Sequence, residues 1–474
     1  MRSWRYLLPL LLLPLIALAR AGGGEDYRSG NDPGGDGIPL DLIILLVELV
    51  FRHPEFGIPL IVVVGIVWTV QKRRRASSSY QRKQEEQRGA ARTGAVPGSV
   101  EHWVGALQRQ DPAFRLEPLL ERARGLVQQV NEAWFLRDLS VLRPFLSDAT
   151  WQRLSTQLTL MDREGRRDAI ADLQVLEVSP IGFERNDWYD TLHLRVRAQI
   201  RDAEVPSSAS DEAARAKAQG APLETFTEVW SFSRRPGAQT RAGHDLWQGN
   251  CPGCGAPFRG GATNACEYCG AIANAGTFDW TLSQISQGSA WTPRAAAVLG
   301  QPEFTAHDPA LSVNQLEDRA ALLFWRWILA LGSRDVTPLL KVAAPSMRAP
   351  LEAAFQAGGS PLGALQNVAL GAARLTRLRL GRPAADGAAA TPDLAEFEVR
   401  WSARLRGAAA ATPQRWAFVL ARKHGALTPQ GHGIASSRCS NCHGPLTDSA
   451  STRCDFCGSA LDAGGEWVLF EARP

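Results

Sequence analysis

The eight cysteines of this sequence form two sets with identical spacing, C-x2-C-x11-C-x2-C, and none is left over. Two thiolates on a tight turn make half of a tetrahedral zinc site, and two such turns complete it. We therefore predict two structural zinc ions. Their ligands are Cys251, Cys254, Cys266 and Cys269 in the first set, and Cys439, Cys442, Cys454 and Cys457 in the second.

Two other uses of paired cysteines fit the sequence less well. A disulfide framework does not require paired turns, nor their repetition at an offset of 188 residues. A redox-active C-x2-C is normally surrounded by a strand–helix–strand pattern, which is missing here. Gly255, Gly270 and Gly458 each follow a cysteine, where such a turn requires a positive φ.

The N-terminus has the pattern of an export signal, which bears on the redox compartment of these cysteines. Arg2 and Arg5 precede an apolar run, and Ala19-Arg20-Ala21 resembles a cleavage site. We predict a signal peptide at residues 1–21 and an exported segment with an apolar helix at residues 22–55.

A second apolar run, residues 56–70, is uncharged and is followed by Lys72-Arg73-Arg74-Arg75. Positive charge marks the cytoplasmic side of a span, so we predict a transmembrane helix here, in a bacterial inner membrane, with all later residues in the cytoplasm. The run would extend about 22 Å, short of the roughly 30 Å hydrocarbon core, so bilayer thinning or the preceding segment must supply the remainder. A buried core helix is the alternative. If the signal is not cleaved, two spans form a hairpin and the body still faces the cytoplasm.

Residues 71–110 form a predicted linker with an unusual charge. Between Lys72 and Arg92 the balance is +6, whereas the whole chain carries +4, so the remainder is weakly acidic and is not a basic nucleic-acid binder. We predict that the linker contacts anionic lipid, at about 1 kcal/mol per basic residue. The alternative is a topology signal with a solvated tail. The contacting residues would be Lys72, Arg73, Arg74, Arg75, Arg82 and Lys83.

Hydrophobic periodicity predicts the same order of elements twice, and helices before antiparallel strands indicate an α+β fold. We expect Asp111 and Asp148 to cap the first two helices, and residues 203–222 to form a mobile loop. The predicted helices cover residues 116–134, 151–161 and 316–331, and the predicted strands cover residues 192–200, 226–232 and 395–405.

Few residues outside the cysteines suggest a site. Trp230 and Phe232 share a strand face, where they line a pocket for lipid or peptide or, as is commoner for such a stripe, belong to the core. Asp190 and His193 are three apart along a strand, so they point to opposite faces and cannot form an acid–base dyad. Because no hydrolase or nucleotide-binding motif occurs, we predict that the protein is not an enzyme. Three arginines share one strand face, which meets either phosphates or solvent: Arg195, Arg197 and Arg201.

Several short motifs carry a resemblance to a known family: Asp111-Pro112-x-Phe114, Arg137-Asp138-Leu139, Tyr189-Asp190-Thr191-Leu192-His193 and Glu228-x-Trp230-Ser231-Phe232. They resemble the Tim44-like domain, the C-terminal domain of the mitochondrial import-motor anchor, which also occurs in bacterial membrane proteins. The resemblance implies a nuclear-transport-factor-2-like cone of helices on a curved antiparallel sheet, peripheral membrane contact and a scaffolding role. The anchor's motor-binding region is missing from this sequence, so motor tethering does not carry over.

The sequence predicts a membrane anchor followed by two tandem α+β domains, the second degenerate, each with a zinc ribbon behind it, and the resemblance implies that both are cones. We expect a cytoplasm-facing scaffold that binds anionic lipid and an unidentified protein partner. The alternative is a nucleic-acid- or ribosome-associated membrane protein, which the single arginines of the two ribbons, Arg259 and Arg453, disfavour. The predicted parts are residues 111–249 (Tim44-like domain), 250–285 (ribbon), 286–310 (linker), 311–425 (second copy) and 436–474 (ribbon).

Overall fold

The computed structural model describes most of the chain after the linker. The described residues are 98–258, 264–288, 291, 298–359, 365–384, 390–405, 412–428, 437–439, 441–442, 444, 446, 451–461 and 465–474. The predicted signal peptide, exported segment, span and lipid-contacting residues lie outside them. Within the described ranges, no helix is both long and apolar enough to cross a membrane.

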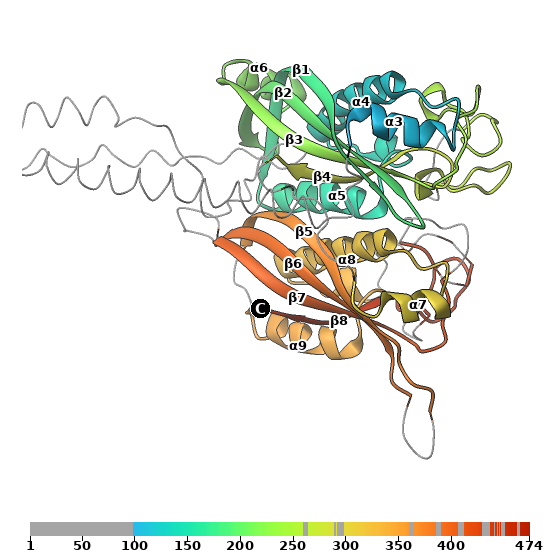
Figure 1. Ribbon diagram of the computed structural model, residues 1–474. Helices are drawn as coiled ribbons and strands as arrows, with labels where there is room; N and C mark the ends of the chain where they lie inside the picture. The colour runs from blue at the N-terminus through green and yellow to red at the C-terminus, as the bar shows by residue number, and fades with distance from the viewer. Residues whose placement is uncertain are drawn as a thin grey trace, which may run out of the picture. The chain divides into compact units, whose positions relative to one another are not determined.

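The first unit places three helices before a four-stranded antiparallel sheet in the order β1-β2-β3-β4 (Figure 1). The helices and strands predicted between residues 116 and 232 are confirmed. The elements are α3 (Val100–Gln108), α4 (Leu116–Leu136), α5 (Asp148–Arg163), β1 (Arg166–Arg185), β2 (Asp190–Pro206), α6 (Asp211–Gln219), β3 (Leu223–Arg234) and β4 (Thr281–Gln287).

Neither predicted helix cap is correct. Helix α4 begins only at Leu116, and the carboxylate of Asp111 instead accepts hydrogen bonds from Arg234 and Thr240. Helix α5 is capped by Ser147, whose hydroxyl accepts from the backbone N–H of Thr150, while Asp148 is the first helical residue. Both aspartates are buried and used for tertiary contacts, which sequence-local reasoning does not detect.

The segment predicted as a mobile loop contains helix α6. Ser210 caps it by accepting from the backbone N–H of Ala213, and two acidic residues in the first turn favour this helix end. Ala214 and Ala218 are fully buried, because their small side chains let the helix pack closely on the sheet. A helix buried through alanines shows little hydrophobic periodicity, so the sequence pattern missed it.

The second unit repeats this order, with a sheet β5-β6-β7-β8. Its long helix ends like α4, at an arginine with left-handed φ: Arg334 at 53° and Arg137 at 60°. The helix predicted at 316–331 and the strand predicted at 395–405 are confirmed, whereas α7 lies inside the predicted linker. The elements are α7 (Gln301–His307), α8 (Val313–Ser333), α9 (Pro345–Gln356), β5 (Leu365–Arg379), β6 (Asp393–Leu405), β7 (Thr412–Arg422) and β8 (Val468–Arg473).

Each four-cysteine segment lies between the third and fourth strands of its sheet. In the first unit β4 follows the cysteines and pairs with β3, with Trp230 opposite Ile285. In the second unit β8 pairs in the same way with β7. The ribbons are therefore insertions within the two units rather than modules appended behind them, and residues 281–287 belong to the first sheet.

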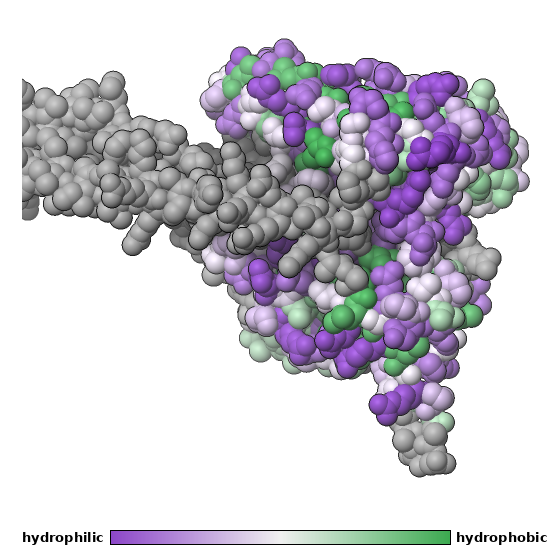
Figure 2. All heavy atoms as spheres, viewed as in Figure 1, coloured by the Kyte–Doolittle hydropathy of each residue, from purple (hydrophilic) through white to green (hydrophobic). Residues whose placement is uncertain are grey.

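Each unit has its own apolar core between helices and sheet. In the second core, the Phe324 ring lies 6.1 Å from Trp327 and 5.7 Å from Trp401, and the Trp327 ring lies 5.6 Å from Phe418. The first core includes Trp230 and the buried faces of α4 and β2. Over the described residues visible in Figure 2 the side chains are mainly polar, with apolar ones scattered among them.

Candidate metal centres

The sulfur positions of both cysteine sets fit a tetrahedral metal ion. In the first set, the Sγ–Sγ distance is 3.7 Å between Cys251 and Cys269 and 3.8 Å between Cys254 and Cys266. Metal–sulfur bonds of about 2.3 Å give a tetrahedron edge of about 3.8 Å, whereas a disulfide would need about 2.05 Å. All four ligand atoms lie within 4.8 Å of one another.

The second set has the same geometry. The Sγ atoms of Cys439 and Cys457 lie 3.8 Å apart, and those of Cys442 and Cys454 lie 3.6 Å apart. The order in which cysteines face one another is also the same, the first with the fourth and the second with the third. Two independent copies of one local structure therefore present equivalent four-thiolate cages.

Local backbone hydrogen bonds build these cages. The N–H of Gly255 donates to the carbonyl of Cys251, and the N–H of Gly253 points at the Cys251 sulfur from 3.3 Å. The expected positive φ angles are confirmed at Gly255 (76°), Gly270 (71°) and Gly458 (70°). A side chain at these positions would be strained, which explains why glycine follows the last cysteine in three of the four turns.

The ribbons are held against the units by buried polar contacts. The Asn264 side chain donates to the carbonyl of Arg143, and the Asn274 side chain donates to the carbonyl of Leu146. In the second unit Lys341 pairs with Asp455 at 2.6 Å, directly beside Cys454. Cys251, Cys266, Cys439 and Cys454 are buried, and the last two belong to the apolar core of the second unit.

Hydrogen bonds favour the thiolate form at part of the second centre. The Ser459 hydroxyl and the Asn441 amide lower the pKa of Cys457 to about 5. At Cys442 burial has the larger effect and raises the pKa to about 12. A metal ion replaces the thiol protons in such a cage, and four soft thiolates with no open position are the donor set of structural zinc.

A buried carboxylate links both units and both ribbons. Oδ1 of Asp148 accepts from Arg143 at 2.6 Å and from the ribbon residue Asn274 at 3.0 Å. Oδ2 accepts from the backbone N–H of Ser437, just before the second cysteine set, at 2.7 Å. Burial raises the pKa of Asp148, but Arg143 and Arg438 outweigh this effect and hold it below its usual value.

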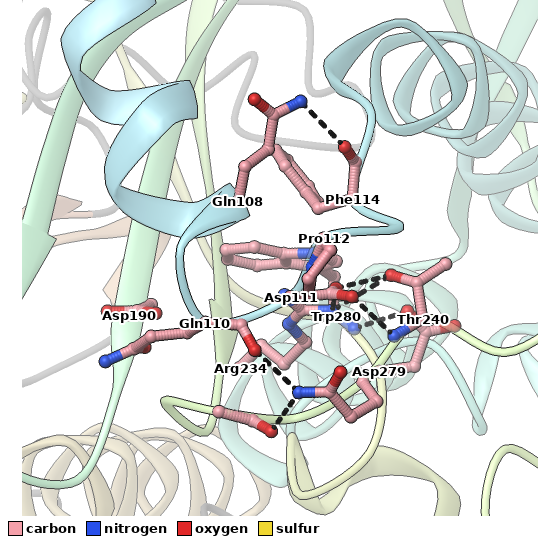
Figure 3. A network of polar contacts seen from close by, with 12 residues as sticks. Gln108, Gln110, Asp111, Pro112, Phe114, Asp190, Arg234, Thr240, Asp279 and Trp280 are labelled. Carbon is pink, nitrogen blue, oxygen red and sulfur yellow. Dashed lines mark hydrogen bonds and ion pairs between the residues drawn. The ribbon is translucent and has the colours of Figure 1, made fainter.

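A second buried network lies where the last strands meet the helical layer (Figure 3). Arg234 donates to Asp111 at 2.9 Å, and the Thr240 hydroxyl donates to the same carboxylate oxygen at 2.6 Å. The guanidinium carbon of Arg234 lies 4.8 Å from the Trp280 ring. This network joins the entry to α4, the end of β3 and the segment after the ribbon.

The remaining predicted positions belong to the fold. Trp230 is fully buried in the first core and donates its ring N–H to Glu228 at 2.8 Å, so the core interpretation accounts for it and for its neighbour Phe232. Asp190 pairs with Arg185, whereas His193 contacts Ser231 at 2.8 Å, so the two have different partners. On the same strand Arg195 and Arg197 are exposed.

The described residues thus define a duplicated α+β protein in which the connection between the last two strands of each sheet carries a four-cysteine cluster suited to metal binding. Residues 102–248 match the model of the Tim44-like domain family, so the chain carries a Tim44-like domain there. One matching solved structure is described as "Ntf2 like protein involved in plasmid conjugation". Its sequence is 7% identical to this one, and the TM-score is 0.15. The match covers 71% of this chain and 92% of the chain of that structure. No curated protein matches the chain.

Proposed function

We propose that this protein is a membrane-anchored, non-catalytic scaffold at the cytoplasmic face of a bacterial inner membrane, stabilised by two zinc ions. The Tim44-like domain at residues 102–248 is the observation that carries the proposal, because membrane association and scaffolding are what this family implies. For each α+β unit we propose the nuclear-transport-factor-2-like cone as the specific fold. The uncharged run at 56–70 and the basic residues after it would supply the anchor.

The position of the ribbons favours a structural role for the metal over nucleic-acid binding. Each ribbon is inserted between two paired strands, and two of its four cysteines are buried. A ribbon that tracks phosphates needs several basic side chains, and each cysteine set encloses one. The basic linker at Lys72–Arg92 is the stronger candidate for contact with an anionic surface.

Flotation with liposomes tests the proposed surface contact. A fragment starting at Lys72 is compared with one starting at Gly98, which keeps α3 and its buried Leu107 in the first core. Without the span, the longer fragment should float with anionic vesicles at low salt and be released near 0.5 M salt, where charges are screened within about 4 Å. The shorter fragment should float much less.

The outcomes separate the possible binding surfaces. Equal flotation of both fragments would show that the folded units, and not the linker, contact the lipid. If neither fragment floats, the proposed lipid contact is wrong. Salt-sensitive retention on RNA, with none on anionic vesicles, would instead favour a nucleic-acid-associated protein.

A further inference from the structure

The buried aspartate–arginine network of the first unit is repeated in the second. Arg422 donates to Asp308 at 2.8 Å, the Thr428 hydroxyl donates to the same oxygen at 2.7 Å, and Arg422 lies 4.6 Å from the Trp467 ring. In both units the aspartate precedes a proline, and the arginine ends the third strand. The two networks can therefore be compared position by position.

Both networks adjoin a second buried aspartate, the first residue of the second strand, opposite the arginine. In the first unit it is Asp190, which lies opposite Arg234 in the register of β2 and β3. In the second unit it is Asp393, which lies opposite Arg422 in the register of β6 and β7. In the first unit Asp190 has an arginine of its own, since Arg185 donates to both of its oxygens at 2.5 and 2.8 Å.

The second unit lacks this additional arginine. Arg379 ends β5 as Arg185 ends β1, but it pairs with Glu396 at 2.7 Å. Asp393, with no exposed surface, instead accepts the backbone N–H of Gly381 at 2.9 Å. Its other oxygen lies 3.6 Å from Arg422, which already binds Asp308.

Two histidines occupy the space around Asp393. His307 stands directly before Asp308, where the first unit has Gln110 (Figure 3). His424 stands two residues after Arg422, where the first unit has Pro236. Around the second carboxylate, two imidazoles thus take the place of the contact that Arg185 makes in the first unit.

We propose that His307, Asp393 and His424 form a third metal site, for a divalent transition-metal ion such as zinc. Their ligand atoms lie within 4.8 Å of one another. His424 Nδ1 is 3.0 Å from Asp393 Oδ1, close to the edge of about 3.3 Å in a tetrahedron with bonds of about 2.0 Å. Two imidazoles and one carboxylate are a known donor set for zinc, with a fourth position left for water.

Two further observations point to a cation at this place. Nε2 of His307 is buried and has no hydrogen-bond partner among the described residues, so a ligand-capable nitrogen is left unused. Asp308, Asp393 and Arg422 are all buried and sum to one negative charge, which a bound cation would balance. Gly381 and Arg422 hold the carboxylate in place, as outer residues do at metal sites.

The imidazole rings are arranged so that both can reach one ion. Their centroids lie 5.5 Å apart with planes 10° from parallel. A small rotation of the His307 side chain would bring its nitrogen towards the Asp393–His424 pair. The His424 side chain is 22% exposed, so water can reach the open position.

Metal counting on the full chain, purified without a histidine tag, tests the site. The wild type should bind about three zinc ions, two in the thiolate cages and one here. His307→Gln, which introduces the first unit's residue, and His424→Asn should each bind about two. His102→Gln, at an exposed position on α3, is the matched control and should keep all three.

Cobalt substitution identifies which site is lost. Thiolate-to-cobalt charge-transfer absorption reports the two ribbons and should be unchanged in both histidine variants, which also shows that they are folded. Only the weaker bands of a nitrogen–oxygen site should disappear. A wild type that saturates at two ions, or two variants that still bind three, would overturn the proposal.

Discussion

At the scale of single residues, Asp148 shows how one carboxylate can stabilise contacts between distant parts of the chain. It is buried, and it receives hydrogen bonds from α5's own approach segment, from the first ribbon and from the residue that leads into the second. Its lowered pKa means that the ionised carboxylate is more stable, relative to the protonated form, in the folded protein than in the unfolded chain. Asp148 therefore adds stability above the ordinary pKa of 3.8, and this contribution is lost as the pH falls through the lower folded value.

We predict that Asp148→Asn lowers the free energy of unfolding of residues 98–474 by about 3–5 kcal/mol at pH 7, because it leaves buried arginine charge uncompensated. The difference from wild type should shrink as the pH falls below 3.8, where the unfolded chain's carboxyl group takes up its proton, and further as the pH passes the lower pKa of the folded protein. Urea unfolding at pH 7 and pH 3 measures both values. Asp187→Asn, at an exposed position, is the control. A difference that does not depend on pH would contradict this role for the charge.

The cysteines and the buried polar residues differ in how far the sequence predicts their roles. The cysteine cages are predictable because a C-x2-C turn with its glycine is a local structure, and its ligands are set by spacing alone. Asp148 meets partners 126 and 289 residues away, so no local pattern distinguishes it from a helix cap. The histidines around Asp393 become visible only when the two units are compared, because neither histidine lies in a motif of its own.

At the scale of elements, each ribbon connects the third strand of its sheet to the fourth. A metal ion bound in the ribbon would therefore act on the fourth strand. Strand β4 (Thr281–Gln287) pairs with β3. It also contacts the start of α5, because the backbone N–H of the cap residue Ser147 donates to the carbonyl of Leu282. Strand β4 can occupy this place only if the ribbon closes the connection compactly. Metal binding in the ribbon should therefore be coupled to the docking of β4.

We predict that Cys251→Ser lowers the zinc content by about one ion per chain and loosens β4 together with the ribbon. Hydrogen exchange should accelerate in Thr281–Gln287, while Asp190–Pro206, in the middle of the same sheet, stays protected. Cys439→Ser is the matched variant and should have the corresponding effect on Val468–Arg473.

Two results would contradict this coupling. Unchanged exchange in β4 would show that the strand docks without the metal. Loss of protection throughout both sheets would show that the ribbon supports the entire fold.

The first strand of each sheet, β1 and β5, was missed for a common physical reason. Strand β1 has register shifts at Ala171/Gln174, Val175/Glu177 and Pro180/Gly182, and β5 has three such shifts of its own. Each shift changes which residues face the core, so the alternation that identifies a strand is interrupted. Strand β2, by contrast, buries alternate residues from Leu192 to Ile200 and was predicted correctly.

At the scale of the whole molecule, the two units are packed together through their helices. Ala149 at the start of α5 belongs to the core of the second unit, and its backbone N–H donates to Asp318 of α8 at 3.3 Å. Trp188 of the first unit donates its ring N–H to the carbonyl of Pro309 at 3.0 Å. Both units therefore belong to one compact part of the chain.

The orientation of that body depends on the charge step at the end of the predicted span. No Lys or Arg lies between Phe56 and Val70, whereas four follow in succession from Lys72. Holding such a cluster on the cytoplasmic side is the main determinant of topology, so the cysteines would be in a reducing compartment, as thiolate zinc sites require.

We predict that a membrane-impermeant thiol reagent added to intact cells does not label Ser78→Cys, and labels it after lysis. Ser29→Cys, before the span, should be labelled in intact cells and is the positive control. Labelling of Ser78→Cys from outside would reverse the topology, and the proposal of a cytoplasm-facing scaffold would have to be abandoned.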